Sequence, residues 1–522
     1  MKRLISLALS LLMLSSIFFS CQKDDRVFDM SQYTIVSGEN AAEEISSAVS
    51  ALSEILPGIK VATDSKKAAD KELLIGNTNR YESESALKTL KRSHTEKAFI
   101  IKVINDQIVI IGNSDSDTAV GVKYFINEYA SPEAQENGIF TITSDTVIIK
   151  TTGDLIGVSD EFNLLVRETL TDIIKEDEKL DSTAFGSIIK LEHSGDKNGI
   201  LLSTHQSDYR KPYQIYVSKD DGKTWKKSGT LEDNLNARRA GYHAEFYELP
   251  EDMGNFKKGT LLLVASFTTE ASVAISVSYS TDVGKSWTTV SDIVSQARIN
   301  DNSFSVIYDD KTARFYCFYQ VYSSHYEREC IVYKYSSDLV NWSEAKYCVI
   351  PKKDKYITYI PSSPSIAKLG NGQYVLAYDL TERTEYSIPE PPVYIKFTDD
   401  LDSWNTADFG SMVKTQSGNR PLKMPSVAWT PSGGECGTLI VAASLMDKAS
   451  VDNKCDWFVS FDYGQSFVTL PSPIPTANVS GNIGDNPGIF VDSEGSIYYL
   501  NNPRIVGGTR NIRFVFSKTE IY

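Results

Sequence analysis

The chain has 522 residues, too many for one ordinary hydrophobic core, so we expect two or more domains. Its formal net charge of −15 argues against a nucleic-acid partner, because binding to phosphates needs a basic surface. Aromatic residues make up 11 % of the chain and include 28 Tyr, a composition that suits β-sheets and sugar-binding surfaces alike.

The N-terminus has the pattern of an exported protein. Two basic residues precede an apolar run over residues 4–19, which has the length of a signal peptide and is short for a membrane span. A serine then precedes Cys21, and polar and charged residues follow it. This resembles the bacterial lipobox and the charged tag of surface lipoproteins of the Bacteroidota. We therefore expect a lipoprotein signal peptide over 1–21, a linker over 22–30, and an outer-membrane, cell-surface protein anchored by lipid on Cys21. An ordinary secreted protein is the alternative.

Five cysteines remain after Cys21, and no two of them form a C-x-x-C pair. An odd number without such a pair argues against both a disulfide framework and a zinc site, so we expect buried free thiols. The sequence also has no H-E-x-x-H helix, no phosphate-binding loop and no serine nucleophile elbow. We therefore expect no cofactor and no metal centre.

Residues 31–152 mix helical and strand patterns. Residues 41–56 carry apolar side chains at helical spacing, and a second helix is predicted over 116–129 with Asp115 or Ser116 as its N-cap. The segments LLIGNTNR and IVIIGNSDSDTAVGVKYFINEY resemble the small α/β domain that precedes the catalytic domain in several glycoside hydrolases, such as α-glucuronidases and β-hexosaminidases. The resemblance implies a domain that supports the catalytic domain and does no chemistry itself.

From about residue 160 onward the helical pattern gives way to short strands separated by polar turns, and one turn sequence repeats. Residues 218–225 and 280–287 both fit S-x-D-x-G-x-x-W, and weaker copies occur at 336–342, 398–404 and 460–467. The repeated aspartate is read at Asp220, Asp282, Asp338, Asp399 and Asp462, so the period is about 60 residues. Asp and Ser side chains bind turn backbone, Gly supplies a positive φ, and Trp anchors the turn.

This turn resembles the Asp-box of sialidase-like propellers, in which it is structural. A length of roughly 360 residues at this period predicts six blades. We expect the sixth blade to combine a strand near 162–167 with strands near 495–500 and 512–517, because such closure removes free sheet edges. The predicted fold class is mainly β: a six-bladed, sialidase-like β-propeller over 160–522, preceded by the small α/β domain.

Most of the predicted propeller resembles a more specific family. The segments HAEFYELPEDMGNFKKGTLLLVAS, SSPSIAKLGNGQYVLAYDL, PPVYIKFTDD and PSVAWTPSGGECGTLIVAAS are similar to successive blades of the exo-acting α-L-arabinanases. Those six-bladed propellers cleave arabinan from a chain end with retention of the anomeric configuration. The resemblance implies a carbohydrate ligand and an exo-acting glycoside hydrolase for plant or host polysaccharide. The three substrate-binding arginines and the F/Y-R-I-P motif of true sialidases are absent from the sequence.

The catalytic pair of that family is not intact. A retaining hydrolase needs two carboxylates about 5 Å apart. Asp379 stands where the family has the Glu of a T-Y-E strand, and Asn302 stands where it has the other Glu, with Asp301 beside it. We therefore expect Asp379 and Asp301 to be the catalytic carboxylates. The altered pair leaves a second interpretation open, a surface lipoprotein that binds glycans without cleaving them.

Ligands of propellers lie over the central channel and meet residues on the innermost strands and their loops. Polar and aromatic side chains at such predicted strand ends can hydrogen-bond sugar hydroxyls, and a His can also exchange protons. The predicted substrate-binding residues are His205, Gln206, His243, Asn302, Tyr319, Gln320, His325, Arg383 and Arg504.

Overall fold

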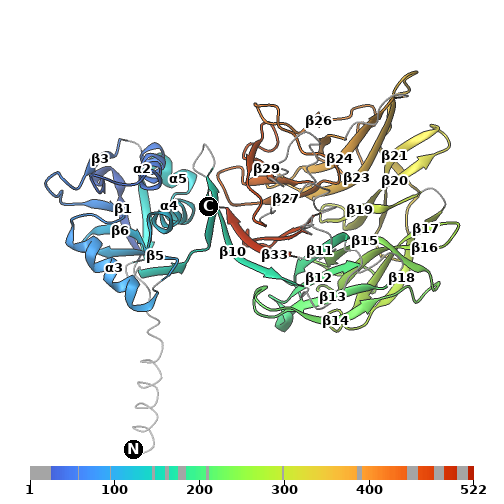
Figure 1. The fold of residues 1–522 in the computed structure, drawn as a ribbon, viewed down its shortest axis with the longest axis horizontal. Helices are drawn as coiled ribbons and strands as arrows, with labels where there is room; N and C mark the ends of the chain where they lie inside the picture. Colours follow the sequence, from blue (N-terminus) through green and yellow to red (C-terminus); the bar gives the residue numbers. More distant parts are fainter. Residues whose placement is uncertain are drawn as a thin grey trace, which may run out of the picture. The chain divides into compact units, whose positions relative to one another are not determined.

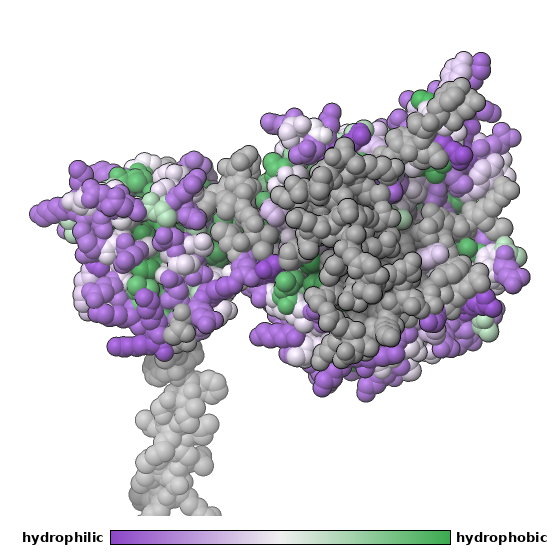
Figure 2. Space-filling view, in the orientation of Figure 1, coloured by the Kyte–Doolittle hydropathy of each residue, from purple (hydrophilic) through white to green (hydrophobic). Residues whose placement is uncertain are grey.

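The computed structural model describes residues 25–56, 58–94, 96–143, 147–158, 164–173, 184–206, 211–296, 299–384, 391–443, 457–474, 487–501 and 515–521. The chain divides into two compact units, residues 1–152 and 153–522. On the side seen in Figure 2, hydrophilic residues cover most of the described surface of each unit. Among the described helices, none is long and apolar enough to cross a membrane.

The first unit is built on a six-stranded sheet in the order β3-β2-β4-β6-β5-β8 (Figure 1). The sheet is parallel from β3 to β6, whereas β5 runs antiparallel to β6 and β8. Its strands are β2 (Thr34–Ser37), β3 (Lys60–Thr63), β4 (Glu72–Ile75), β5 (Ala98–Ile104), β6 (Gln107–Gly112) and β8 (Val147–Thr151). A separate pair joins β1 (Asp25–Asp29) to β7 (Ile139–Thr143).

The helices of this unit are α2 (Glu43–Ile55), α3 (Tyr81–Ser93), α4 (Asp115–Tyr129) and α5 (Pro132–Asn137), with a 3-10 turn at Met30–Gln32. The predicted N-cap of α4 was wrong. Ser114 caps the helix: its hydroxyl accepts from the backbone N–H of Asp117, whose carboxylate accepts in return from the N–H of Ser114. This reciprocal capping box satisfies two backbone donors at once, which neither Asp115 nor Ser116 does here.

The second unit is a six-bladed β-propeller, and the predicted blade number is confirmed (Figure 1). Each of the first five blades begins with its innermost strand. The first three blades are β11 (Ala184–Lys190), β12 (Leu201–Gln206), β13 (Tyr213–Ser218) and β14 (Lys226–Leu231); β15 (Arg239–Glu248), β16 (Leu261–Thr268), β17 (Val273–Ser280) and β18 (Thr288–Gln296); and β19 (Ile299–Asp309), β20 (Arg314–Ser323), β21 (Arg328–Ser336) and β22 (Lys346–Val349).

The fourth and fifth blades repeat the same order with shorter outer strands. They are β23 (Thr358–Lys368), β24 (Tyr374–Arg383), β25 (Val393–Thr398) and β26 (Ser411–Met412), and β27 (Ser426–Thr430), β28 (Thr438–Ala442), β29 (Trp457–Ser460) and β30 (Val468–Leu470). A 3-10 turn at Gly195–Lys197 lies in the hairpin between β11 and β12.

The sixth blade joins the two ends of the second unit. It runs from β31 (Gly488–Val491) through β32 (Ile497–Asn501) and β33 (Val515–Ile521) to β10 (Leu164–Asp172), and Figure 1 shows β10 beside β33. The predicted closure is therefore confirmed. A fifth strand, β9 (Asp154–Val158), extends the blade from residues that the sequence analysis left between the two domains. Pairing across the closure removes the free edges at which the ring would open.

The repeated turns are held by local hydrogen bonds. In the first, the Ser218 hydroxyl donates to Asp220 over 2.8 Å and accepts from the N–H of Gly222 over 2.9 Å. The turns beginning at Ser280, Ser336 and Ser460 repeat the Ser-to-Asp bond. In the remaining copy Asp400, rather than Asp399, accepts from the following turn, so the repeated aspartate there is one residue later than predicted.

Each turn aromatic packs toward the preceding blade. Trp225 meets Phe516 of the sixth blade edge-on, with ring centroids 5.3 Å apart, and Trp287 lies in the apolar cluster between the first and second blades. Six such clusters of buried residues fill the six interfaces between neighbouring blades. The sequence repeat thus builds one apolar core per interface, because every sheet needs a partner for its hydrophobic faces.

Blade six carries a carboxyl group in an unfavourable environment. Glu520, on β33, accepts a 2.5 Å hydrogen bond from Ser496. Burial raises the pKa of Glu520 to about 7, and the nearby carboxylate of Glu168 adds to the rise, while Lys518 opposes it. A carboxyl whose pKa is higher in the folded than in the unfolded chain supports folding only while it stays protonated.

We expect Glu520→Gln to stabilise the protein at alkaline pH. The stabilising contribution of Glu520 is complete below its ordinary pKa of 4.5 and is lost as the pH rises through about 7. The amide is neutral throughout, so the variant should exceed wild type in free energy of unfolding at pH 8 by roughly 2–3 kcal/mol, with the gap closing near pH 4. Urea unfolding from pH 4 to pH 8 measures this. Exposed Glu327→Gln is the control, and a Glu520→Gln protein less stable than wild type at pH 8 contradicts the prediction.

Candidate functional site

Antiparallel pairing places most of the predicted site residues on one face of the propeller. The second strand of each blade ends where the inner strand begins, as the pairs Ala184–Gln206, Ile299–Val321 and Thr358–Arg383 show. We call this the upper face. The repeated turns connect the third and fourth strands at the opposite, lower face, because Ser218 pairs with Leu201 at the start of β12.

Asp379 lies just beyond the middle of β24 and is only 3 % exposed. One carboxylate oxygen accepts from the hydroxyl of Ser362, and the other accepts from the backbone N–H of Met424 over 2.8 Å. Burial raises the pKa of Asp379, while hydrogen bonds from Ser362 and Met424 act in the opposite direction. A carboxyl of raised pKa can hold or exchange a proton closer to neutral pH than an ordinary Asp.

The backbone around Asp379 is strained. Ser363, Lys423 and Met424 have φ values of 52°, 55° and 43°, in the left-handed region that side-chain-bearing residues avoid. Met424 donates to Asp379, and Ser363 also hydrogen-bonds its carboxylate. Such conformations persist only where the surroundings enforce them, and they collect at functional sites. Asp379, on the second strand of the fourth blade, is therefore held rigidly against the turn that leads into the fifth blade's inner strand.

A small cavity of about 140 Å³ lies on the propeller axis. Residues of all six inner segments line it, with the hydroxyl-bearing ones placed at matching positions in successive blades. The lining residues are Gly186, Ser187, His243, Glu245, Phe304, Ser305, Pro364, Ser365, Ile366, Pro425, Ser426, Val427, Pro487, Gly488 and Ile489. Glu245 is the acidic member of this set.

Serine hydroxyls tie neighbouring inner strands together around the cavity. Ser187 accepts from the N–H of Phe246 over 3.0 Å, Ser305 from Ile366 over 3.3 Å, and Ser365 from Val427 over 3.1 Å. Ser426 donates its hydroxyl to the carbonyl of Pro487. These bonds run from one blade to the next and satisfy backbone groups of the inner strands at the axis.

Glu245 takes the place of serine in the second blade. It accepts from the N–H of Val306 and, over 3.3 Å, from the hydroxyl of Ser305. Burial raises the pKa of Glu245, and His243 and these donors act against the rise. Its Oε2 lies 3.9 Å from Nε2 of His243, whose ring meets Phe304 edge-on at 4.6 Å. The cavity thus holds one carboxyl and one imidazole side by side.

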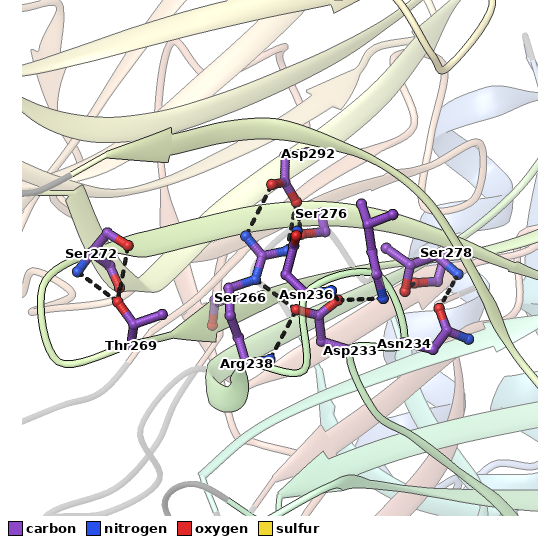
Figure 3. A network of polar contacts seen from close by, with 12 residues as sticks. Asp233, Asn234, Asn236, Arg238, Ser266, Thr269, Ser272, Ser276, Ser278 and Asp292 are labelled. Atoms are coloured by element: carbon purple, nitrogen blue, oxygen red, sulfur yellow. Dashed lines mark hydrogen bonds and ion pairs between the residues drawn. The ribbon is translucent and has the colours of Figure 1, made fainter.

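A buried ion network fixes the loop that leads into β15, the strand of His243 and Glu245 (Figure 3). Arg238 binds Asp233 through Nε over 2.6 Å and Asp292 through its terminal nitrogens over 2.7 and 3.0 Å. Burial raises the pKa of Asp233, but hydrogen bonds from Arg238 and from backbone N–H groups outweigh it and hold that pKa below its ordinary value. The network therefore places the start of the inner strand.

Other predicted binding residues lie away from the cavity. His205 is fully buried in the first blade, where it stacks on Tyr216, and burial lowers its pKa to about 3, so it is a neutral imidazole. Tyr319 and Gln320 are also buried, Tyr319 within the core between the second and third blades. His325 and Arg383 are exposed, His325 beyond the end of β20 and Arg383 as the last residue of β24. None of these five is among the residues that line the axial cavity.

Some predicted residues lie outside the part of the chain that the structure describes. Asp301 and Asn302 have their backbone in β19, and Gln206 ends β12, but the side chains of all three lie outside the described part. Arg504 and Cys21 lie outside the described residues altogether.

Glu245 was not among the predicted site residues, although the sequence contains a signal for it. Segments about 60 residues apart on the six inner strands can be aligned with one another. They are GSII (186–189), AEFY (244–247), FSVI (304–307), PSIA (364–367), PSVA (425–428) and PGIF (487–490). In this register the ring position is Ser187, Glu245, Ser305, Ser365, Ser426 and Gly488. A repeat alignment that followed the inner strands instead of the turns would have shown one acid among small residues.

No protein-family model matches the chain, and no curated protein matches its sequence. Solved structures do match. An α-L-arabinanase of Penicillium chrysogenum, complexed with arabinobiose, is 25 % identical with a TM-score of 0.55, over 67 % of this chain and 97 % of that one. An α-L-arabinofuranosidase of Fusarium graminearum, bound to an iminosugar inhibitor, is 21 % identical with a TM-score of 0.56, over 68 % and 97 %. The GH93 α-L-arabinofuranosidase of the same organism, in complex with arabinobiose, is 21 % identical with a TM-score of 0.55, over 67 % of this chain and 95 % of that one. The chain is therefore a six-bladed β-propeller similar in structure to GH93 arabinanases and arabinofuranosidases.

Proposed function

We propose that this protein is an exo-acting glycoside hydrolase that removes sugar units from the ends of plant or host polysaccharide at the cell surface. The observation that carries the proposal is the similarity of the chain to an arabinanase structure with bound arabinobiose, across 97 % of that enzyme. Fold alone does not set function. The site adds a carboxyl of raised pKa, Asp379 on β24, and a small polar cavity on the axis.

The proposed hydrolysis needs two carboxyl groups in the site. In a retaining hydrolase one carboxylate attacks the anomeric carbon while the other carboxyl gives its proton to the departing oxygen; water then displaces the enzyme carboxylate and returns the proton. Asp379 is proposed for one role. Asp301, from the sequence, is proposed for the other.

The test is product analysis with the purified full-length protein. Arabinobiose, linear arabinan, other pectic chains and host glycans serve as substrates, and chromatography with proton NMR of the first product identifies the sugar and its anomer. We expect single sugar units to appear from the chain end. Absence of released sugar from every one of these substrates overturns the hydrolase proposal.

A second candidate function is glycan binding without turnover. The contacts of Asp379 favour it: both carboxylate oxygens already accept hydrogen bonds from the protein, and the residue is 3 % exposed. A carboxylate used only to brace β24 and the Met424 turn would have this environment. Calorimetry with arabinan and with the host glycans distinguishes the two functions, since a binding protein gives heat of association with no product.

We further propose that lipid on Cys21 anchors the protein at the outer membrane. The apolar run before Cys21 and the polar residues after it support this. Cells that express the protein in radiolabelled palmitate should label wild type and not Cys21→Ala. Equal labelling of the two proteins contradicts the anchor.

A further inference from the structure

The ring of inner strands has one position at which a carboxylate replaces a small residue. Serines 187, 305 and 365 each accept one backbone N–H from the next blade. Glu245 accepts the equivalent N–H, from Val306. A serine would therefore meet the structural need of this position, as it does in three other blades. The glutamate adds something that the fold does not require.

Glu245 adds a carboxylate, which is costly to bury. Moving a carboxylate from water into a protein interior disfavours its charged form, and Glu245 has no lysine or arginine among the residues that line the cavity. The titratable groups around it are His243 on its own strand, Tyr247 two residues further on, and Cys317 on β20. A group that opposes stability and is still present at the centre of a site is characteristic of function.

The geometry leaves one side of Glu245 available. One oxygen, Oε1, receives the Ser305 hydroxyl, while Oε2 lies beside His243 and the side chain stays 25 % exposed. His243 stands two residues nearer the upper face on the same inner strand, and its side chain is 12 % exposed. Both side chains line the axial cavity.

We propose that Glu245 and His243 form a sugar-binding subsite, in which Oε2 of the carboxylate accepts a hydrogen bond from a hydroxyl of a single neutral sugar ring and His243 contacts the same ring. This inference rests on the proposed function and identifies the residues that would bind the terminal sugar. A hydrogen bond from a hydroxyl to an ionised carboxylate is charge-assisted and stronger than one between neutral groups.

The cavity also limits the class of ligand. Its volume of about 140 Å³ is smaller than the roughly 300–1,000 Å³ of sites for drug-sized ligands, so it accommodates one ring and no chain beyond it. A cavity that holds one ring suits a terminal sugar unit, as exo-cleavage requires. Glu245 repels a uronate or sulfated ring, so the terminal unit should be neutral.

Glu245→Ser tests the subsite, because it gives the second blade the residue that the other blades use. Isothermal calorimetry with arabinobiose on the full-length protein is the measurement. We expect the Kd to rise about 10- to 100-fold, which corresponds to the loss of a charge-assisted hydrogen bond, and Glu245→Gln to fall between wild type and Glu245→Ser. The melting temperature of Glu245→Ser should equal or exceed that of wild type, since Val306 keeps an acceptor.

Glu248→Gln is the matched control, on the same strand. Its carboxylate accepts from the backbone of Glu192 and His193 and from Ser194, at the lower end of β15 and away from the cavity. This variant should melt earlier than wild type and bind arabinobiose equally well. A Kd of Glu245→Ser within twofold of wild type overturns the subsite, and so does a fall in its melting temperature as large as that of Glu248→Gln.

The proposed function and the subsite can fail separately. If wild type cleaves or binds arabinobiose and Glu245→Ser does so equally, the function holds and the subsite is wrong. If wild type shows neither activity with arabinobiose, both proteins are compared on an array of neutral and acidic glycans. A neutral glycan that binds wild type and not Glu245→Ser supports the subsite for another sugar; identical array profiles, or no bound glycan at all, overturn it.

Discussion

Replacing Asp379 by Asn is expected to lower kcat/KM for release of the terminal sugar by about 10²–10⁴-fold, the usual contribution of a positioned acid or base. The amide has nearly the shape of the acid and keeps one oxygen to accept from Ser362 or Met424. It can neither attack as a carboxylate nor pass a proton. Initial rates on arabinobiose, or on whichever substrate wild type cleaves, give the effect directly.

The same substitution should leave stability nearly unchanged. Burial raises the pKa of Asp379, so its charged form is disfavoured in the folded protein, and a neutral Asn avoids that penalty. Asp309→Asn is the control. Asp309 is equally buried at the lower end of β19, where burial raises its pKa, but hydrogen bonds from Thr312 and Tyr374 outweigh burial and hold that pKa below the ordinary value, so its charged form is favoured. We expect it to lose stability and keep activity. An Asp379→Asn protein with wild-type rates, or one that fails to fold while Asp309→Asn folds, contradicts a catalytic role.

Removing the cation of the Figure 3 network is expected to have the largest effect on stability. Arg238→Met should lower the free energy of unfolding by about 3–5 kcal/mol, because it leaves Asp233, whose side chain is fully buried, without its counter-charge. Ligand affinity should fall as well, since the same loop places the start of β15 and therefore His243. Chemical unfolding and calorimetry with the sugar measure the two effects.

Arg314→Met provides the comparison. The side chains of Asp402 and Arg314 are 24 % and 34 % exposed, so breaking this pair should cost less than about 1 kcal/mol.

The pH dependence of the stability difference between wild type and Arg238→Met gives a further test. The pKa of Asp233 is held below its ordinary value of 3.8, so its contribution is present above that pH and is lost as the pH falls through the folded-state pKa. The gap between wild type and Arg238→Met should therefore shrink below about pH 4. A gap that widens on acidification contradicts this account.

The blade number could be predicted because its signal is local. Each repeated turn closes through hydrogen bonds that span at most four residues, such as those from Ser218 to Asp220 and Gly222, so a linear reading finds it. Closure through β10 and β33 followed from the need to pair sheet edges. The N-cap of α4 failed for the opposite reason: several Asp and Ser residues compete at that position, and only the reciprocal bond to Asp117 decides among them.

Which strand-end residues face the axis could not be predicted in the same way. His205, Tyr319 and His243 all stand near the upper ends of strands, yet the first two are buried within blades and only His243 lines the cavity. Side-chain direction depends on the irregular pairing in these strands, such as the shift between Ala240 and Ala244 within which His243 lies. A bulge reverses the alternation on which a sequence pattern depends.

By itself the sequence determined six similar sheets, closed into a ring, and an acid at position 379, because turns, strand alternation and edge pairing are set by neighbouring residues. Only the tertiary structure decided that Glu245, His243 and the serines of other blades share one cavity, and that Asp233, Arg238 and Asp292 hold the strand that carries two of them. The physical reason is radial assembly: residues about 60 positions apart become neighbours at the axis only after every blade has packed on the next.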